Sequence, residues 1–200
     1  MPTAPRHDPA APVVLAFGDS LTAGYGLPSD QSFAAQLQAA LRRDRPGARV
    51  LNAGVSGDTT AGGLARLPRV LSGLSAHPDL AIVELGANDL LRGIDPGETR
   101  RNLDGILHAL TQARIPVLVA GMMAPPFLGP FAWRFNEVFG AVAAAHGAAL
   151  YPFFLDGVVG DPTLVLADGL HPNARAIGIV TERILPTVVA SLSRWMDDAA

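Results

Sequence analysis

Short apolar runs alternate with amphipathic segments along nearly the whole chain, and this alternation restricts the fold more than any other feature of the sequence. Residues 13–17 (Val-Val-Leu-Ala-Phe) form an uninterrupted apolar run that stops at a glycine. Such a run is typical of a strand that is buried on both faces. Comparable runs predict further strands at residues 49–53, 80–85, 117–120 and 148–153.

The segments between these runs have the apolar periodicity of helices. In residues 32–43, Phe33, Leu37 and Leu41 recur every four positions, which predicts one apolar helix face. Further helices are predicted at residues 60–74, 96–114, 133–146 and 173–196. Repeated alternation of strands and helices implies right-handed crossovers and a parallel sheet that is covered on both faces. The sequence therefore predicts an α/β fold, a three-layer α/β/α sandwich around a five-stranded parallel sheet.

The length of 200 residues suits one domain, and we expect that domain to cover residues 1–200, with a flexible segment at residues 1–12. This first segment lacks the apolar stretch of a secretory signal. The sequence therefore fits a cytoplasmic protein, or a periplasmic or secreted one from which a signal peptide has been removed. It makes no prediction of the oligomeric state.

Charge and composition argue against several classes of partner. The net charge is −3, so neither nucleic acid nor an anionic membrane is expected as a partner. No apolar run reaches the ~18 residues of a membrane span, and no integral membrane association is expected. Cysteine is absent, four of the five histidines show no ligand spacing with acidic residues, and no glycine-rich loop is followed by a lysine. We therefore expect no metal and no other cofactor.

Polar residues that can carry chemistry follow the predicted strands, and ligands of parallel sheets bind outside the carboxyl ends of the strands. The first strand is followed by residues 18–21 (Gly-Asp-Ser-Leu) and the second by residues 54–58 (Gly-Val-Ser-Gly-Asp). Residues 86–89 (Gly-Ala-Asn-Asp) follow the third strand, and the loop after the fifth ends in residues 168–171 (Asp-Gly-Leu-His). One edge of the sheet would thus gather a serine, a glycine turn, an asparagine amide and an Asp/His pair.

Ser20, His171 and Asp168 are the residue types that nucleophilic catalysis by serine requires. A serine hydroxyl is a poor nucleophile unless an imidazole takes its proton, and the imidazole needs an acceptor on its other nitrogen. Taken singly, each residue has an ordinary structural explanation, such as Ser20 or Asp168 capping a helix. Together with two loops that offer oxyanion donors, the three residues predict a serine hydrolase.

The four motifs, in this order, resemble those of the SGNH, or GDSL, hydrolase family, whose members have a flavodoxin-like three-layer fold. The resemblance covers about residues 13–190. The strings at residues 19–26 and 85–89 resemble one branch in particular, the bacterial arylesterases and multifunctional acyl-CoA thioesterases and lysophospholipases. The resemblance implies a serine esterase that hydrolyses carboxylic esters through an acyl-enzyme.

The same resemblance implies a role for each matching residue. Ser20 would be the nucleophile, His171 the general base and then acid, and Asp168 the partner that orients His171. The oxyanion hole would consist of the backbone N–H groups of Ser20 and Gly57 and the side-chain amide of Asn88. These roles agree with the chemistry of the residues, because glycine lets the backbone approach a substrate and an asparagine amide offers N–H donors.

Apolar residues after the third and fourth strands suggest a hydrophobic substrate. Residues 122–133 are too apolar for a solvated loop and would form either a flap on the core or a wall for an acyl or aryl group. The predicted substrate contacts are Leu90, Leu91, Ile94, Phe127 and Trp133. We expect a small-molecule ester with a short acyl chain or an aryl group, with thioesters and lysophospholipids as further substrates to test.

Two other functions stay open at this point. A carbohydrate esterase that removes acetyl groups from sugars would need a polar cleft with aromatic platforms, and only Trp133 and Tyr25 lie near the predicted edge. An acyl- or lipid-binding module would bind without catalysis, but such a module needs no nucleophile, base or oxyanion donor.

Three acidic residues near the predicted site are expected to be structural. Asp19 and Asp89 flank site residues and should brace their loops through hydrogen bonds to backbone N–H groups. Glu84 lies within an apolar run and needs a polar partner if it is buried.

Overall fold

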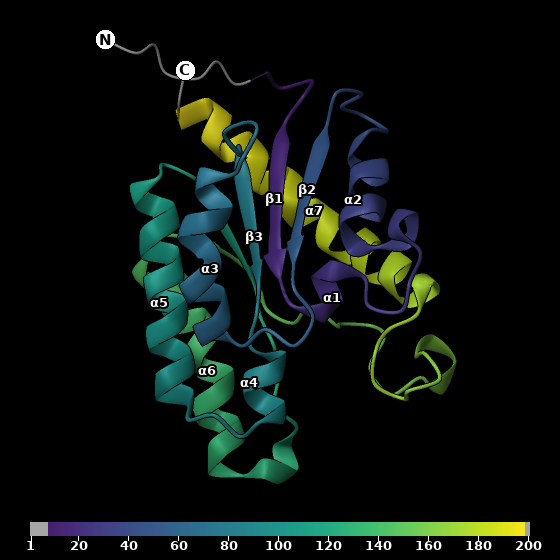
Figure 1. Cartoon of the computed structure of the whole chain (residues 1–200), viewed down its shortest axis with the longest axis vertical. Helices are drawn as coiled ribbons and strands as arrows, with labels where there is room; N and C mark the ends of the chain where they lie inside the picture. Colours follow the sequence, from purple (N-terminus) through teal and green to yellow (C-terminus); the bar gives the residue numbers. More distant parts are fainter. Residues whose placement is uncertain (1–7, 199–200) are drawn as a thin grey trace.

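The computed structural model describes residues 8–198 and has a five-stranded sheet at its centre (Figure 1). The spatial order is β2-β1-β3-β4-β5, and every neighbouring pair is parallel, which confirms the predicted fold class. The strands are β1 Val13–Gly18, β2 Arg49–Gly54, β3 Leu80–Glu84, β4 Val117–Ala120 and β5 Ala149–Tyr151. Residues 1–7 lie outside the described residues, so the predicted flexible segment at 1–12 is described only from residue 8.

Helices cover both faces of the sheet. On one face α2 (Phe33–Leu41) packs against α7 (Ala174–Asp198). On the other face α5 (Pro96–Gln112) lies between α3 (Thr60–Ser72) and α6 (Pro130–Ala145) and contacts both (Figure 1). This arrangement is the predicted three-layer sandwich.

The apolar runs form the inner strands because those strands are buried on both faces. All five residues of β3 and all four of β4 are buried, as are the residues of β1 after the first. Large side chains such as Phe17 and Ile82 are fully buried. Burying each such side chain stabilises the fold by about 1.5–3 kcal/mol. The outer strands β2 and β5 are partly exposed, which fits their less continuous apolar sequence.

Local signals set the helix ends. The side chain of Asp95 accepts a hydrogen bond from the N–H of Gly97 at 2.9 Å, and Pro96 occupies the first helical position of α5. Helix α6 begins at Pro130 and not at the predicted residue 133, because Gly129 turns the chain with a φ of 56°. The last helix reaches residue 198, beyond its predicted end at 196.

Among the described residues, two short α-helices were not predicted, and both lie where strands end. Helix α1 (Ser20–Ala23) directly follows β1, and α4 (Ala87–Leu91) follows β3. The carboxyl ends of β1 and β3 therefore open onto the same end of the molecule (Figure 1). Segments of four and five residues are too short to show helical periodicity, so the sequence gives no signal for them.

Residues 174–194 of α7 are long and apolar enough to cross a membrane by length and composition alone. In the fold, Val180, Ile184 and Val188, spaced four apart, are fully buried against the rest of the protein. A helix that packs against the core of a globular domain has the same row of buried apolar residues along one face. The absence of integral membrane association therefore stays a prediction.

Candidate active site

Ser20 is the first residue of α1, directly after β1, and only 9% of it is exposed. A side chain at Gly18 would collide with the hydroxyl of Thr22 and with Glu84, so a glycine is needed where the strand turns into the helix. Asp19 caps α1 by accepting a hydrogen bond from a backbone N–H of the helix at 3.0 Å. The motif at residues 18–21 thus places the hydroxyl of Ser20 at the start of a helix.

Ser20, His171 and Asp168 form a continuous chain of hydrogen bonds. The Oγ atom of Ser20 lies 3.0 Å from Nε2 of His171, and Nδ1 of His171 lies 2.7 Å from Oδ2 of Asp168. An ionised carboxylate only accepts hydrogen bonds, so Nδ1 carries the proton and Nε2 of the neutral ring is free to accept from the serine hydroxyl. The structure brings together three predicted residues of which two are 151 positions apart.

Backbone groups hold Asp168 in place. Its Oδ1 atom accepts hydrogen bonds from the N–H groups of Leu170 and His171, at 2.9 and 3.0 Å. These two bonds and the bond with the imidazole lower the pKa of Asp168 to about 2, so the group is ionised at neutral pH. The ring of Tyr25 packs beside that of His171, with centroids 4.4 Å apart, and limits the positions of the imidazole.

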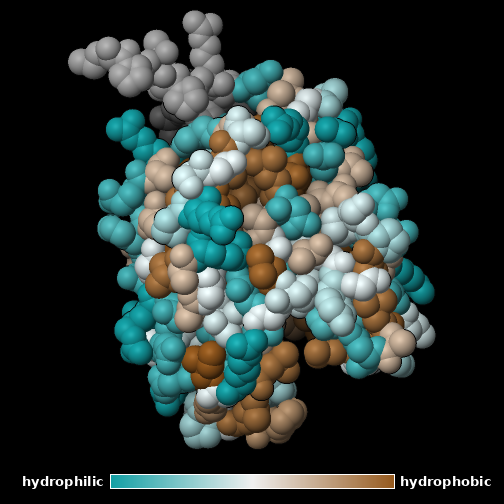
Figure 2. All heavy atoms as spheres, viewed as in Figure 1, coloured by the Kyte–Doolittle hydropathy of each residue, from teal (hydrophilic) through white to brown (hydrophobic). Residues whose placement is uncertain are grey.

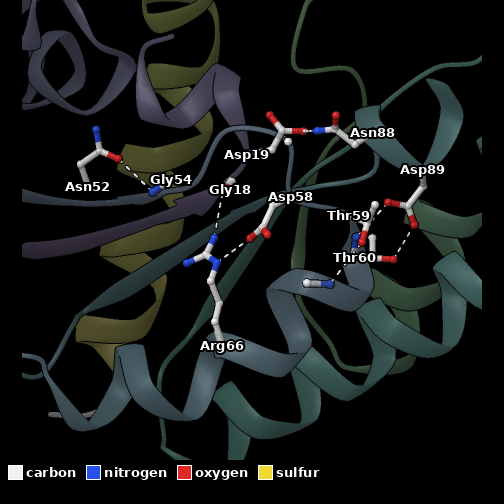
Figure 3. A network of polar contacts seen from close by, with 12 residues as sticks. Gly18, Asp19, Asn52, Gly54, Asp58, Thr59, Thr60, Arg66, Asn88 and Asp89 are labelled. Carbon is white, nitrogen blue, oxygen red and sulfur yellow. Dashed lines mark hydrogen bonds and ion pairs between the residues drawn. The ribbon is translucent and has the colours of Figure 1, made fainter. Parts of the chain in front are cut away.

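The predicted oxyanion donors lie in the loops after β2 and β3. Asn88 belongs to α4, and its Nδ2 atom donates a hydrogen bond to Oδ2 of Asp19 at 2.9 Å (Figure 3). Gly57 has a φ of 83°, a left-handed conformation that favours glycine. Ser20, Gly57, Asn88 and His171 all line one cavity. An ester carbonyl in this cavity would therefore meet the hydroxyl and the candidate donors together.

Arg92 connects two of these loops, and its role was not predicted from the sequence. Its Nη2 atom donates a hydrogen bond to the backbone oxygen of Gly57 at 2.7 Å. Arg92 is exposed to solvent, and it links the end of α4 to the glycine turn after β2. Its position four residues after Asn88 was the only available signal, because such spacing places both on one side of a short helix.

Asp89 braces α4 against its neighbours, as predicted. It is fully buried, and its carboxylate accepts hydrogen bonds from the N–H and hydroxyl of Thr60 (Figure 3). It also accepts a hydrogen bond from the hydroxyl of Thr99. Thr60 begins α3 and Thr99 lies in the first turns of α5. One carboxylate therefore fixes the helix of Asn88 to two helices of the adjacent layer.

Arg66 holds the loops after β1 and β2 from the same side. Its Nε atom donates to Asp58 at 2.5 Å and its Nη2 atom donates to the backbone oxygen of Gly18 at 2.9 Å (Figure 3). The guanidinium also lies 4.2 Å from the ring centre of Phe17. This mostly buried ion pair was not predicted, because Arg66 and Asp58 come together only through the start of α3.

Glu84 lies fully buried beneath the turn of Ser20. The hydroxyl of Thr22 donates to its Oε2 atom at 2.7 Å, which is the polar partner that a buried glutamate needs. Desolvation and the nearby charge of Asp19 raise the pKa of Glu84 well above its usual value. Glu84 therefore has the buried structural position that its place in an apolar strand predicted.

The cavity beside Ser20 has a volume of about 640 Å³ and mostly apolar walls. Met122, Phe153 and Leu155 line it from the loops after β4 and β5, and Val159 and Leu170 line it near the loop of His171. In Figure 2, hydrophobic side chains gather at the lower end of the molecule, where α4 and the start of α6 lie. A cavity of this size and polarity suits an acyl or aryl group.

The predicted substrate contacts separate into two groups. Leu90 and Leu91 line the cavity. Ile94, Phe127 and Trp133 are not among its lining residues, and Phe127 and Trp133 are 84% and 72% exposed. The apolar segment after β4 does form a wall, but through residues 122–126 and not through its aromatic members.

Among residues 8–198, no group of three or more histidine and acidic side chains lies close enough to hold a metal ion. The chemistry that this arrangement can perform is proton transfer between a hydroxyl and an imidazole, with hydrogen-bond donors beside them.

Several known proteins are similar to this chain in sequence. The model of the GDSL-like lipase/acylhydrolase family matches residues 16–176. The esterase TesA of Pseudomonas aeruginosa is 42% identical over 180 residues, which cover 90% of this chain and 89% of that protein. An arylesterase of Vibrio mimicus is 35% identical over 184 residues, with 92% and 91% covered. The crystal structure of AlinE4, an SGNH-hydrolase family esterase, is 48% identical, covers 91% of this chain and 97% of that one, and superposes with a TM-score of 0.77.

Proposed function

Because the chain belongs to the GDSL-like lipase/acylhydrolase family and is a carboxylic ester hydrolase, we propose that Ser20, His171 and Asp168 are its catalytic triad. The observation that carries this proposal is the hydrogen-bonded chain of the three side chains, with contacts of 3.0 and 2.7 Å. The tautomer that Asp168 selects leaves Nε2 of His171 ready to take a proton.

The reaction consists of two acyl transfers. Ser20 attacks the ester carbonyl while His171 takes its proton, and His171 then protonates the leaving alcohol. Water repeats the sequence on the acyl-enzyme and releases the acid. During both transfers the backbone N–H groups of Ser20 and Gly57 and the side chain of Asn88 hold the negative oxygen.

The acyl or aryl part of the ester occupies the apolar cavity. Leu90 and Leu91 contact it from α4, and Met122 and Leu155 contact it from the opposite loops, since all four line the cavity. A volume of about 640 Å³ leaves room for short and medium acyl chains and for aryl groups. Thioesters and lysophospholipids share the acyl part and differ in the leaving group, so the same site can be tested on them.

The cavity supports an acyl substrate better than a sugar. A sugar-binding cleft needs several polar groups for hydroxyls, whereas the walls here are mostly aliphatic, methionine, proline and phenylalanine side chains. Apart from the candidate catalytic groups, Ser56 and Tyr25 supply the polar side chains of the lining. A module that only binds acyl groups would not need the hydrogen-bonded triad. We further propose that the sheet and its helices act as one catalytic domain.

The test is hydrolysis of p-nitrophenyl esters from acetate to palmitate by the wild type, by Ser20→Ala and by a control, Ser75→Ala. Ser75 is an exposed serine in the loop between α3 and β3, outside the lining of the cavity. Activity should disappear in Ser20→Ala alone, and a fluorophosphonate probe should label only proteins that retain Ser20. Hydrolysis or labelling that persists in Ser20→Ala would overturn the proposed triad.

A further inference from the structure

Asp19 is a buried carboxylate that contacts a candidate oxyanion donor directly. The side chain is fully buried between β1 and α4. Its Oδ1 atom accepts the N–H of Leu21 at 3.0 Å, and its Oδ2 atom accepts from Nδ2 of Asn88 at 2.9 Å (Figure 3). Asp19 and Asn88 are 69 positions apart, so this contact joins two separate loops of the site. The first bond caps α1, while the second has no capping function.

The second bond decides which way the amide of Asn88 faces. The oxygen and the nitrogen of an asparagine amide have nearly the same shape, and only their hydrogen-bond partners distinguish them. An ionised carboxylate can only accept, so Asp19 selects the nitrogen of Asn88 for the position beside it. One N–H of this nitrogen is used by Asp19, and the other stays available to the cavity that Asn88 lines.

We propose that Asp19 is a positioning residue that keeps the amide nitrogen of Asn88, and not its oxygen, turned toward the oxyanion of the reaction. The proposal rests on the triad mechanism proposed above. With the opposite orientation, Asn88 would place a carbonyl oxygen where negative charge develops and would oppose the transition state. The hydrogen bonds from Leu21 and Asn88 lower the pKa of Asp19 against the larger effect of burial, which leaves it at about 6 and the side chain ionised above neutral pH.

Asp89 is a second buried carboxylate beside Asn88, and its contacts are purely structural. It is equally buried, but its partners are Thr60 and Thr99, which lie outside the lining of the cavity. Substituting Asp89 should therefore affect the stability of α4, whereas substituting Asp19 should affect the chemical step. The two aspartates form a matched pair for experiment.

The test uses Asp19→Asn, which keeps an oxygen for the N–H of Leu21 and replaces Oδ2 by an amide nitrogen. Two donors then face each other, and Asn88 relieves the conflict by turning its oxygen toward residue 19 and its nitrogen away. Losing one oxyanion donor lowers kcat by about 10²–10³-fold. We expect a loss of at least about 100-fold in kcat for p-nitrophenyl butyrate, with KM changed by less than about threefold, because only the transition state loses an interaction.

A double-mutant cycle separates this role from a general effect on the site. In an Asn88→Ala background the amide is absent, so Asp19→Asn should change kcat by less than about threefold. If Asp19 acted through the charge of His171 or through stability, the two losses would multiply instead. Multiplying losses, or a kcat unchanged in Asp19→Asn, would overturn the proposal. The control Asp89→Asn should lower the free energy of unfolding and reduce kcat less than Asp19→Asn does, and an equal loss of kcat in the two variants would overturn the proposal.

Two further measurements separate a failure of the proposed triad from a failure of the proposed role of Asp19. Persistent activity in Ser20→Ala would overturn the triad, whereas multiplying losses in an enzyme that depends on Ser20 would overturn only the role of Asp19. If Asp19→Asn does not fold, NMR of the wild type replaces it, with the side-chain amide of Asn88 assigned by its disappearance in Asn88→Ala. One amide proton should exchange with solvent more slowly than the other, and equal exchange of both would refute the contact with Asp19.

Discussion

The buried carboxylate of Asp19 should make the protein less stable at neutral pH than in mild acid, and Asp19→Asn should remove this dependence. Desolvation raises the pKa of Asp19 from 3.8 to about 6, and the negative charge of Asp58 adds to the rise. The hydrogen bonds from Leu21 and Asn88 and the charge of His171 oppose it. The ionised side chain is therefore held in the fold at a cost that other interactions offset.

The magnitude follows from the two pKa values. Between about pH 4 and pH 6 the folded protein keeps a proton on Asp19 that the unfolded chain has released. The free energy of unfolding therefore decreases as the pH rises through this window and stays lower above it. A difference of about two pKa units corresponds to about 3 kcal/mol. Between pH 4 and pH 8, the free energy of unfolding of the wild type should fall by about 3 kcal/mol relative to that of Asp19→Asn.

The assay is urea unfolding of the wild type and of Asp19→Asn at intervals from about pH 4 to pH 8. A loss of contacts in the variant changes its free energy of unfolding by the same amount at every pH. The test is therefore whether the difference in free energy of unfolding between the two proteins changes with pH. Glu84 is the second buried carboxyl beside this group, and the pair is measured again in Glu84→Gln to remove its titration. Two curves that stay parallel across the range would refute the reasoning.

Three further outcomes are expected. Arg92→Ala should lower kcat roughly tenfold, because it releases the turn of Gly57, and this loss is smaller than that of an oxyanion donor itself. Arg92→Lys should have an intermediate kcat, and an unchanged kcat in Arg92→Ala would contradict the role of the hydrogen bond to Gly57. Thr22→Val keeps the shape of the side chain but removes the hydroxyl that donates to Glu84, so the free energy of unfolding should fall by about 1–3 kcal/mol. An unchanged midpoint in urea titrations would contradict this contribution of the hydrogen bond. Leu155→Trp should narrow the cavity and reduce kcat/KM for p-nitrophenyl decanoate more than for acetate, and equal losses on both esters would show that Leu155 does not contact the chain.

The strands and the layers of the fold could be predicted because a strand that is buried on both faces is apolar along nearly its whole length. The inner strands β1, β3 and β4 contain almost only apolar side chains, and no other element of this length within residues 8–198 does. The short helices α1 and α4 could not be predicted in this way. They are held by contacts with distant elements and not by their own periodicity. Asp89 of α4 bonds to Thr60 and Thr99 in two other helices, and Thr22 of α1 bonds to Glu84 in β3.

The candidate site was predictable to the extent that strand ends determine where side chains meet. Ser20, Asn88 and His171 each follow a strand or precede the last helix, and the parallel sheet brings them together. The cavity wall was less predictable, because a loop can place any of its apolar residues inward. Phe127 and Trp133 are the largest apolar side chains near the end of that segment, yet both are exposed and outside the cavity lining, to which Met122 belongs.

The separation of Ser20 and His171 by 151 positions has a consequence for the life of the chain during synthesis. In the proposed mechanism Ser20 is the nucleophile and His171 its base, and Ser20 is synthesised first. A nascent chain that has not yet reached residue 171 therefore lacks the imidazole that the proposed mechanism requires. Contacts so distant in sequence form late in folding, since loop closure must come first. With the proposed triad, ester hydrolysis begins only after the stretch from Ser20 to His171 has been made and folded, so activity reports on the folding of that stretch.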